Sequence, residues 1–146
     1  MPTTRRKKSE KMVIEQYDGL NNTPALPLAL EGWHSLVQRG LTDNTIVIGW
    51  DDKALVYRKG GVAMGVLTFD LTEWRKEIYV KIGFVLPQYR RKGVYTALFD
   101  CLTEYARRKG IKFIVGATLT ANAEMRATYK KQGRAEFAII SKFEVK

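Results

Sequence analysis

The chain of 146 residues is 45% hydrophobic and carries 25 Lys and Arg against 15 Asp and Glu, a formal net charge of +10. This length suits one domain with a buried core. No apolar run is long enough to span a membrane and no hydrophobic segment follows the charged N-terminus, so we expect no transmembrane helix, no signal peptide and a cytoplasmic location. One Cys and one His exclude an internal disulfide and disfavour a structural zinc site, so no metal site is predicted.

Part of the excess positive charge lies in the N-terminal tail. The run Arg5-Arg6-Lys7-Lys8 has no apolar companions, so we expect residues 1–11 to form a basic, disordered tail and residues 12–146 a single domain. In one interpretation the tail is solvated and keeps the chain soluble. In the other it binds nucleic acid or an acidic protein.

The first half of the domain has the pattern of strands around one helix. A strand is predicted from Met12 to Tyr17, before the turn dipeptide Asp18-Gly19. Apolar residues at helical spacing then predict a helix that ends near Gly40. These residues are Leu28, Leu30, Trp33, Leu36 and Val37. Apolar and β-branched runs predict antiparallel, hairpin-linked strands, with a turn at 72–75 before the last one. The predicted strands cover residues 45–50, 54–58, 62–69 and 77–86.

The second half alternates helices and strands. An apolar i, i+3, i+4 stripe predicts a helix that begins near Val94 and ends before Gly110. A buried strand at 112–117 follows. Because a helix separates it from the 77–86 strand, the two strands should pair in parallel. Another helix is predicted over 122–131, so a meander precedes a β-α-β-α unit.

The turn before the Val94 helix has the features of an anion site. Pro87 removes a backbone donor and ends the strand, while Gly93 permits conformations that other residues avoid. The first N–H groups of the helix lack intrahelical partners and lie at the positive end of its dipole. Arg90, Arg91 and Lys92 add cationic donors. The alternative is a basic turn without a ligand. No Walker-type phosphate loop and no dinucleotide-binding glycine motif occurs, so the usual nucleotide loops are excluded.

Two motifs in order resemble the GNAT superfamily of acyl-CoA-dependent N-acetyltransferases. That family has the pattern Q/R-x-x-G-x-G/A between a strand and a helix, and residues 90–95 fit it except that Tyr95 replaces a small residue. Residues 122–133 resemble the family's N-x-x-A-x-x-x-Y-x-K-x-G helix, with Met125 at the Ala position. Arg134 follows, where the family commonly has an aromatic residue. The resemblance implies that the anion is the diphosphate of coenzyme A.

The resemblance also implies a fold and an activity. The expected fold class is α/β (α+β), a mixed, mostly antiparallel twisted sheet with a central parallel strand pair splayed around the cofactor and helices on both faces. The expected reaction transfers an acetyl group from acetyl-CoA to a primary amine of a small molecule or a protein. Backbone amides of the 77–86 strand are expected to hold the acetyl group. The expected cofactor-binding residues are Phe84, Val85, Leu86, Arg90, Arg91, Lys92, Gly93, Val94, Tyr95, Thr96 and Asn122.

Tyr129 is the expected catalytic residue. By resemblance it lies beside the thioester sulfur and acts as general acid. A free Tyr titrates near ~10 and a thiol near ~8.5, so complete proton transfer is uphill by roughly 2 kcal/mol unless the Tyr is acidified, for which Arg126 and Lys130 are candidates. This favours Tyr129 as a hydrogen-bond donor to the developing thiolate. The alternative is a Tyr that only packs on the parallel strands.

The general base is predicted from strand alternation. Alternate residues from Glu77 to Val85 should share one face, and Glu77 is the only carboxylate among them. Glu77 can take the amine proton through a water, or form an ion pair with Arg75 or Lys81 instead. His34 is the only imidazole, but a lone helical His is more often a surface residue.

Asn122 has two expected roles. Its side chain can cap the helix that it precedes, which is the simpler role. By resemblance it can also bond to a pantetheine amide of the cofactor.

Residues 135–145 depart from the family, because one apolar stretch stands where two terminal strands are expected. We expect an incomplete terminal hairpin, with the sheet edge completed by a second subunit, as in a homodimer, or by the strand near Ile46. Two other functions stay open. The charge of +10 suits an acceptor amine on a nucleic acid, such as a charged transfer RNA or a DNA base. Tyr95, which replaces a small residue of the family motif, suits a coenzyme A-binding module without catalysis.

Overall fold

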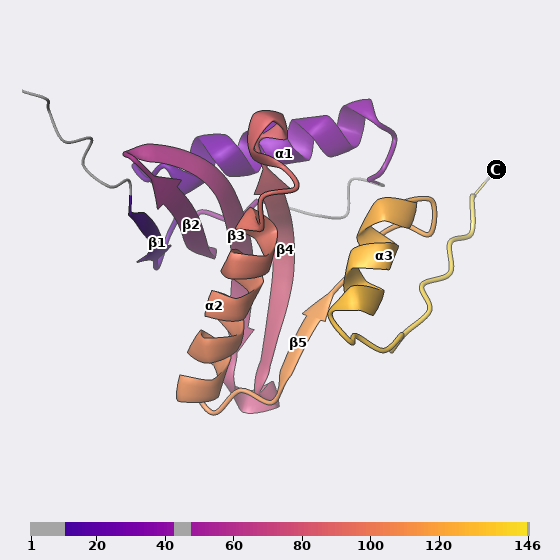
Figure 1. Cartoon of the computed structure of the whole chain (residues 1–146). Coiled ribbons are helices and arrows are strands. Elements are labelled where there is room, and N and C mark those ends of the chain that lie inside the picture. Colours follow the sequence, from indigo (N-terminus) through magenta and orange to yellow (C-terminus); the bar gives the residue numbers. More distant parts are fainter. Residues whose placement is uncertain (1–10, 43–47, 146) are drawn as a thin grey trace, which may run out of the picture.

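The sheet follows the chain from strand to strand. The computed structural model describes residues 11–42 and 48–145, and these form a five-stranded sheet in the order β1-β2-β3-β4-β5 with helices on both faces (Figure 1). The strands are β1 (Met12–Tyr17), β2 (Lys53–Lys59), β3 (Val62–Thr72), β4 (Glu77–Val85) and β5 (Phe113–Gly116). The helices are α1 (Ala25–Gln38), α2 (Val94–Arg108) and α3 (Ala123–Lys131), with short 3-10 turns η1 (Glu73–Arg75) and η2 (Pro87–Tyr89). The predicted mixed fold is confirmed.

The parallel pair is short and open at one end. Strands β1 to β4 pair antiparallel, whereas β4 and β5 pair in parallel because α2 carries the chain back across the sheet. Only Glu77–Val80 of β4 pair with β5, and β4 then continues to Val85. Figure 1 shows β5 diverging from β4 toward α3. The predicted splay of the two strands is confirmed.

Helices α1 and α2 cover opposite faces of the sheet, each over its own apolar cluster. The cluster under α2 includes Phe69, Ile78, Leu98 and Leu102. The cluster under α1 includes Leu28, Val66, Ile82 and Phe84. Each face of the sheet is therefore closed by one helix, as the amphipathic pattern of α2 requires.

The buried face of α1 differs from the predicted stripe. The helix buries Ala25, Leu28, Ala29 and Gly32, whereas Leu30 is 50% exposed and Val37 is 45% exposed. A Cβ added at Gly32 would lie 2.7 Å from the Cβ of Phe84. Small residues thus form the contact, because the backbone of α1 approaches β4 closely.

The strand predicted at 45–50 is not found where the chain is described. Residues 45–47 lie outside the described residues, and residues 48–50 are not in a strand. The predicted hairpin with 54–58 is wrong for this part, because β1 and β3 occupy both edges of β2. The turn is held instead by Asp52, whose carboxylate accepts a hydrogen bond of 2.9 Å from Gly49 N–H.

One extra residue in β4 changes the predicted faces of this strand. Thr68 of β3 pairs with Ile82 and Phe69 pairs with Val80, so Lys81 is the extra residue of a β-bulge. Val80 therefore packs under α2 but Ile82 packs under α1, although residues two positions apart share one face in a regular strand. The prediction that Glu77, Tyr79, Lys81, Gly83 and Val85 share one face is wrong, because a bulge reverses the alternation.

Lys81 is held by two carboxylates. Its ammonium lies 2.8 Å from Asp52 Oδ1 and 3.2 Å from Asp70 Oδ2, and the Asp52 side chain is only 1% exposed. Burial lowers the pKa of Lys81, but hydrogen bonds and charge from the two carboxylates outweigh it and raise the pKa overall. The ammonium therefore stays charged at neutral pH and compensates the buried Asp52.

The C-terminal segment 134–145 forms no strand, so no terminal hairpin is present in the described chain. No described strand pairs with the outer edge of β5. Among the residues that the structure describes, no helix is long and apolar enough to cross a membrane.

Replacing Lys81 tests the ion pair at the bulge. Lys81→Met should lower the free energy of unfolding by about 3–5 kcal/mol, because it leaves the Asp52 carboxylate buried without its cation. Denaturant unfolding at neutral pH measures this loss. The control Lys53→Met breaks the pair with Asp18, which is 79% exposed, and should cost less than about 1 kcal/mol. Equal losses in the two variants would contradict the structural role of Lys81.

Candidate functional site

The N-terminus of α2 presents a row of backbone N–H groups. Gly93 precedes the helix at φ 79°, and no described side chain caps it. Ala97 N–H donates to Gly93 C=O at 3.0 Å, so the N–H groups of residues 94–96 have no intrahelical acceptor. Arg91 also has a positive φ, of 62°. Backbone N–H groups around such residues form a concave nest, and the helix dipole adds positive potential there. This geometry suits a phosphate group.

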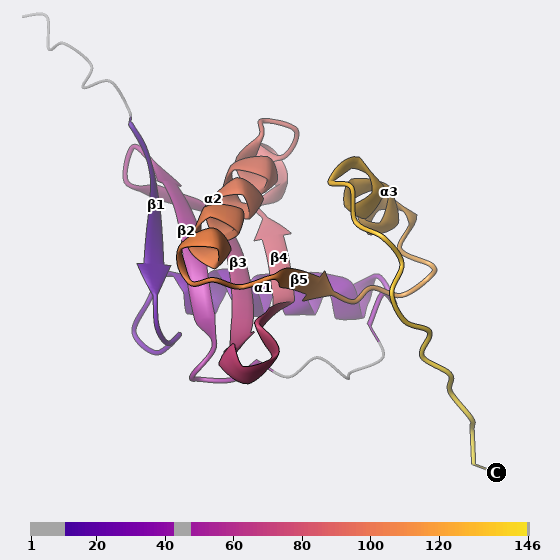
Figure 2. The same cartoon turned by 90° about the horizontal axis from the view of Figure 1, so that it is seen from below.

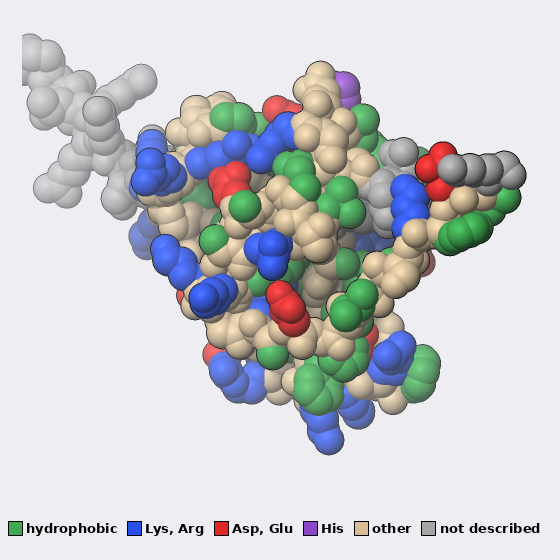
Figure 3. Space-filling view, turned by 90° about the vertical axis from the view of Figure 1, so that its right-hand side faces the viewer, with side chains coloured by type: hydrophobic (Ala, Val, Ile, Leu, Met, Phe, Trp, Pro, Cys, Tyr) green, Lys and Arg blue, Asp and Glu red, His purple; other side chains and the backbone are tan. Residues whose placement is uncertain are grey.

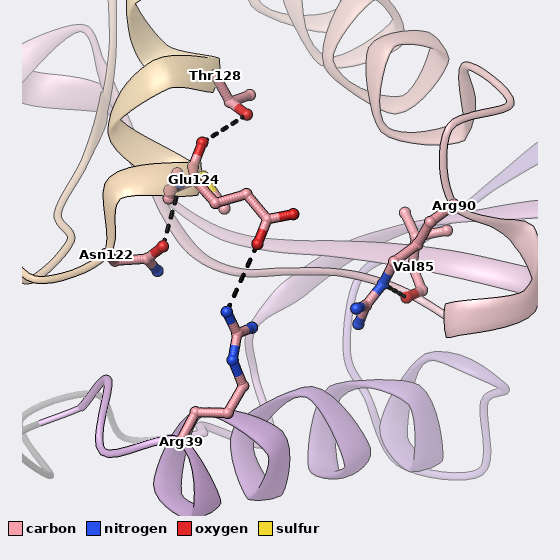
Figure 4. Close-up of polar contacts among 7 residues, drawn as sticks. Arg39, Val85, Arg90, Asn122, Glu124 and Thr128 are labelled. Atoms are coloured by element: carbon pink, nitrogen blue, oxygen red, sulfur yellow. Dashed lines mark hydrogen bonds and ion pairs between the residues drawn. The ribbon is translucent and has the colours of Figure 1, made fainter.

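The three predicted cations do not act alike. Arg91 and Lys92 are exposed next to the nest. The Nε of Arg90 instead donates to Val85 C=O at 3.0 Å (Figure 4), and its guanidinium lies over the Phe84 ring at 5.6 Å. Arg90 therefore stabilises the end of β4 and η2, while Arg91 and Lys92 are the side chains available to an anion.

Tyr95 turns toward the sheet. A Cβ added at Gly83 of β4 would lie 2.7 Å from Tyr95 Cε2, so the ring occupies the space that Gly83 leaves open. Burial raises the pKa of Tyr95, opposed by the charge of Arg134. The departure from a small residue at this position is thus matched by a glycine on β4, and the Tyr95 side chain does not close the nest of amides.

Tyr129 lies at the open end of the parallel pair. Its hydroxyl is 2.9 Å from the position that a Cβ on Gly116 would take, and Gly116 belongs to the last pair between β4 and β5. Burial raises the pKa of Tyr129, and the Tyr95 phenol acts in the same direction, while Arg134 opposes it. The phenol is therefore protonated at neutral pH and can donate a hydrogen bond.

Arg134 was not among the predicted site residues, yet its Cζ lies 4.3 Å from the centroid of the Tyr129 ring. In the sequence it stands where the related motif has an aromatic residue. Arg126 and Lys130, the cations considered for Tyr129, are both exposed, and neither contributes to its pKa shift. The exchange of an aromatic residue for Arg134 was the available signal.

Asn122 caps α3. Its Oδ1 accepts the N–H of Met125 at 3.1 Å, which confirms the predicted capping role (Figure 4). The next turn is tied to α1 by an ion pair of 3.5 Å between Glu124 and Arg39. Binding of a pantetheine amide by Asn122 stays a prediction.

Residues 84–86, which were predicted to hold the acetyl group, differ in their burial and hydrogen bonding. Phe84 and Val85 are buried on opposite faces. Leu86 N–H already donates to Met64 C=O at 2.9 Å, so this amide is engaged within the fold. Binding of the acetyl group by backbone amides of this strand stays a prediction. Beyond Val80, the edge of β4 that faces β5 has no described strand partner.

The two candidate bases lie apart from Tyr129. Glu77 begins β4, roughly 10 Å along the strand from Val80, and forms the predicted ion pair with Arg75 at 3.8 Å. His34 is exposed on α1. The structure therefore brings neither side chain into contact with the Tyr129 end of the site.

A cleft of about 460 Å³ separates α2 from α3, two helices that lie on one side of β5 (Figure 2). Its lining residues are Thr96, Phe99, Asp100, Thr128, Lys131 and Gln132. The cleft lies between Thr96, in the first turn of α2, and Thr128, the neighbour of Tyr129 on α3. The nest with Arg91 and Lys92 fits the diphosphate of coenzyme A, and β4 has an open strand edge beyond Val80. Among the described residues, no group of three or more His, Cys, Asp or Glu side chains could hold a metal ion.

Known proteins share this fold. A family model described as the Acetyltransferase (GNAT) family matches residues 19–133. No curated protein matches. An aminoglycoside acetyltransferase from an uncultured soil metagenomic sample, in complex with trehalose, has a TM-score of 0.69 at 13% identity, over 92% of this chain and 97% of its own. The aminoglycoside N-acetyltransferase AAC(6')-Iy in complex with CoA has a TM-score of 0.62 at 18% identity, over 95% of this chain and 97% of its own. An IAA acetyltransferase from Bacillus cereus has a TM-score of 0.65 at 23% identity, over 84% of this chain and 75% of its own.

Two glycines test the nest. Gly93 and Gly61 have φ of 79° and 77°, and a Cβ at either meets nothing within 4 Å. Gly93→Ala and Gly61→Ala should each cost about 1–2 kcal/mol of stability, because alanine is strained in this region. Only Gly93→Ala should also weaken coenzyme A binding, by about tenfold, because its methyl group projects beside the nest. Calorimetry measures both affinities, and equal affinities would contradict the predicted diphosphate position.

Proposed function

The chain belongs to the GNAT acetyltransferase family, and on this basis we propose that it transfers an acetyl group from acetyl-CoA to a primary amine of a small molecule or a protein. The observation that carries the proposal is the nest of free amides at the start of α2, next to the cleft that Thr96 and Thr128 line. The similar structure of AAC(6')-Iy is a complex with CoA, which supports acetyl-CoA as the donor substrate.

Different parts of the chain are proposed to bind different parts of acetyl-CoA. The diphosphate of the donor is proposed to bind the N–H groups of Gly93, Val94, Tyr95 and Thr96, with Arg91 and Lys92 as charge-assisted donors. The pantetheine arm then follows the unpaired edge of β4 beyond Val80. The thioester supplies the activated acyl group at the end of this path.

The reaction is proposed as a direct attack. The amine nitrogen forms a bond to the acetyl carbon, the C–S bond breaks, and sulfur leaves with the electron pair. Tyr129 donates a hydrogen bond to this sulfur. Because burial raises its pKa, complete proton transfer from Tyr129 is even less favourable than for a free tyrosine. Glu77 stays the proposed base, acting through water because of its distance from Tyr129.

The net charge of the chain is the basis for the proposed class of acceptor. The solved structures of similar fold include aminoglycoside acetyltransferases, whose substrate class is rich in amines. The net charge of +10 repels polycations and favours acceptors that are neutral or anionic overall. The same charge favours the alternative acceptor, an amine carried by nucleic acid. A cytoplasmic location, with a single unpaired Cys101, is part of the proposal.

A homodimer is also proposed. In the C-terminal segment, four of the five odd-numbered positions from 137 to 145 are apolar, with Ser141 the exception. Phe137, Ile139 and Phe143 are 82%, 94% and 88% exposed. Figure 3, which views the molecule from the side of α3, shows hydrophobic side chains exposed on this face. The segment has the period of a strand, and the outer edge of β5 offers unpaired backbone groups to a second copy.

Sedimentation velocity tests the dimer. At micromolar concentration the protein should sediment as twice its chain mass of 16.7 kDa. Replacing Ile139 and Phe143 together by Glu should give a monomer, because charges then block the apolar face. Gly61→Ala serves as the control that keeps this face. A monomer at every concentration of the unmodified chain would contradict the proposal.

Acetyl transfer is tested with Tyr129→Phe. Acetyl-CoA binding is measured by calorimetry, and thiol release is followed over a panel of small amines, aminoglycosides, peptides and charged transfer RNA. The variant should lower kcat by about 10²-fold with nearly unchanged acetyl-CoA affinity. Because the pKa of Tyr129 is raised, its contribution should persist to higher pH than that of a free tyrosine, which ionises near ~10.

The control for this experiment is Tyr57→Phe, on β2, which should keep full activity. Acetyl-CoA binding without acetylation of any amine would favour the non-catalytic module. Absence of acetyl-CoA binding would overturn the proposed function as a whole.

A further inference from the structure

Arg134 carries a buried charge that the described chain does not neutralise. Its Nε, Nη1 and Nη2 are all inaccessible to solvent, and none makes a hydrogen bond of good geometry to a described residue. Its polar neighbours are the phenols of Tyr95 and Tyr129, which carry no charge to balance it. No ion pair is formed with any described carboxylate. Unpaired buried guanidinium donors are costly, because the charge has lost its hydration without gaining an acceptor. A guanidinium kept in this state indicates a partner that the described residues do not supply.

The guanidinium is fixed in place rather than mobile. It lies between two rings, with Cζ 4.5 Å from the centroid of Phe99 on α2 and 4.3 Å from that of Tyr129 on α3. Such stacking on aromatic faces suits arginine in particular. The backbone is also held, since Arg134 N–H donates to Tyr129 C=O at 3.0 Å. The direction of the side chain is therefore set by three contacts.

Arg134 and Tyr129 point to the same spot. A Cβ built on Gly116 would lie 2.9 Å from the hydroxyl of Tyr129 and 3.0 Å from Nη1 of Arg134. Gly116 is the last β5 residue paired with β4. The two donors thus meet where the parallel strands begin to separate. Phe99, which stacks on Arg134, also lines the cleft between α2 and α3.

The surroundings of the guanidinium are neutral phenols. Tyr95 reaches it from α2 and Tyr129 from α3, and Tyr79 faces Tyr129 from β4. Burial raises the pKa of both Tyr95 and Tyr129, so neither phenol is ionised at neutral pH to balance the charge. The missing partner is therefore an anion, and it must fit beside a tyrosine hydroxyl.

We propose that Arg134 and Tyr129 together form a binding site for the thiolate of coenzyme A. The inference rests on the proposed function and assigns a residue that this function does not require. When the amine nitrogen bonds to the acetyl carbon and the C–S bond breaks, sulfur leaves with the electron pair. Arg134 stabilises the resulting negative charge as an ion pair, and Tyr129 donates a hydrogen bond. The proton lost by the amine passes through water to Glu77, the proposed base, so the thiolate is released without a proton from Tyr129.

The thiol pKa of bound coenzyme A tests this site directly. Its thiol is titrated by the ultraviolet absorbance of the thiolate, with saturating protein. In the unmodified protein the pKa of the bound thiol should lie below that of free coenzyme A. Arg134→Met, of similar length but neutral, should abolish the shift, and Arg134→Lys should keep part of it. Arg126→Met, which removes an exposed arginine of α3, is the matched control and should keep all of it.

Kinetics and stability separate this role from a packing role. Arg134→Met should lower kcat by about 10²-fold, as expected for loss of one donor to a developing charge, with KM for acetyl-CoA nearly unchanged. The melting temperature should stay the same or rise, because the variant removes an unpaired buried charge. An equal thiol pKa in the unmodified protein and Arg134→Met would overturn the inference, and so would a lower melting temperature with kcat unchanged. Absence of coenzyme A binding by the unmodified protein would overturn the proposed function as well.

Discussion

The site depends on the single extra residue in β4. Lys81 is the bulged residue opposite β3, and it follows Val80, the last residue of β4 that pairs with β5. The buried pair with Asp52 holds the ammonium, which makes the bulge part of the structure rather than a local irregularity. Beyond it, the strand turns Ile82 and Phe84 toward α1 and leaves Gly83 facing α2. Every residue proposed to contact the donor thioester lies after this point.

Two glycines on the parallel strands make the space that the site uses. Gly83 accommodates the ring of Tyr95, and Gly116 accommodates Tyr129 and Arg134. Larger residues at either position would collide with these side chains, so helices α2 and α3 could not keep their present distance from the sheet. The cleft between the helices is thus a consequence of small residues on the strands. The same principle applies to α1, where Gly32 allows contact with Phe84.

The sequence predicted most of the fold because its periodic patterns are strong. The amphipathic stripe of α2, the turn residues Pro87 and Gly93, and the crossover that makes β5 parallel all appear in the structure. Strand alternation failed in β4, since a bulge has no signature in a run of apolar residues. The stripe of α1 failed because close helix–sheet contact selects small residues rather than large ones.

The site was only partly predictable. The motif around Gly93 indicated an anion site, and the nest of amides agrees with it. Arg134 could not be assigned a role, because its burial results from α2, α3 and β5 coming together. The position of Glu77 relative to Tyr129 was equally inaccessible, since it depends on where the parallel pairing ends. Spacing along the chain identifies residue types, whereas tertiary contacts decide which of them meet.

The central claim is that the free amides at the start of α2 bind the diphosphate of coenzyme A. Amide chemical shifts of the isotopically labelled protein, followed by NMR during a titration with coenzyme A, test it most directly. The account predicts that the largest shifts fall on residues 91–96, with smaller ones on Gly116 and Arg134. Largest shifts on β1 and β2, with residues 91–96 unchanged, would contradict it.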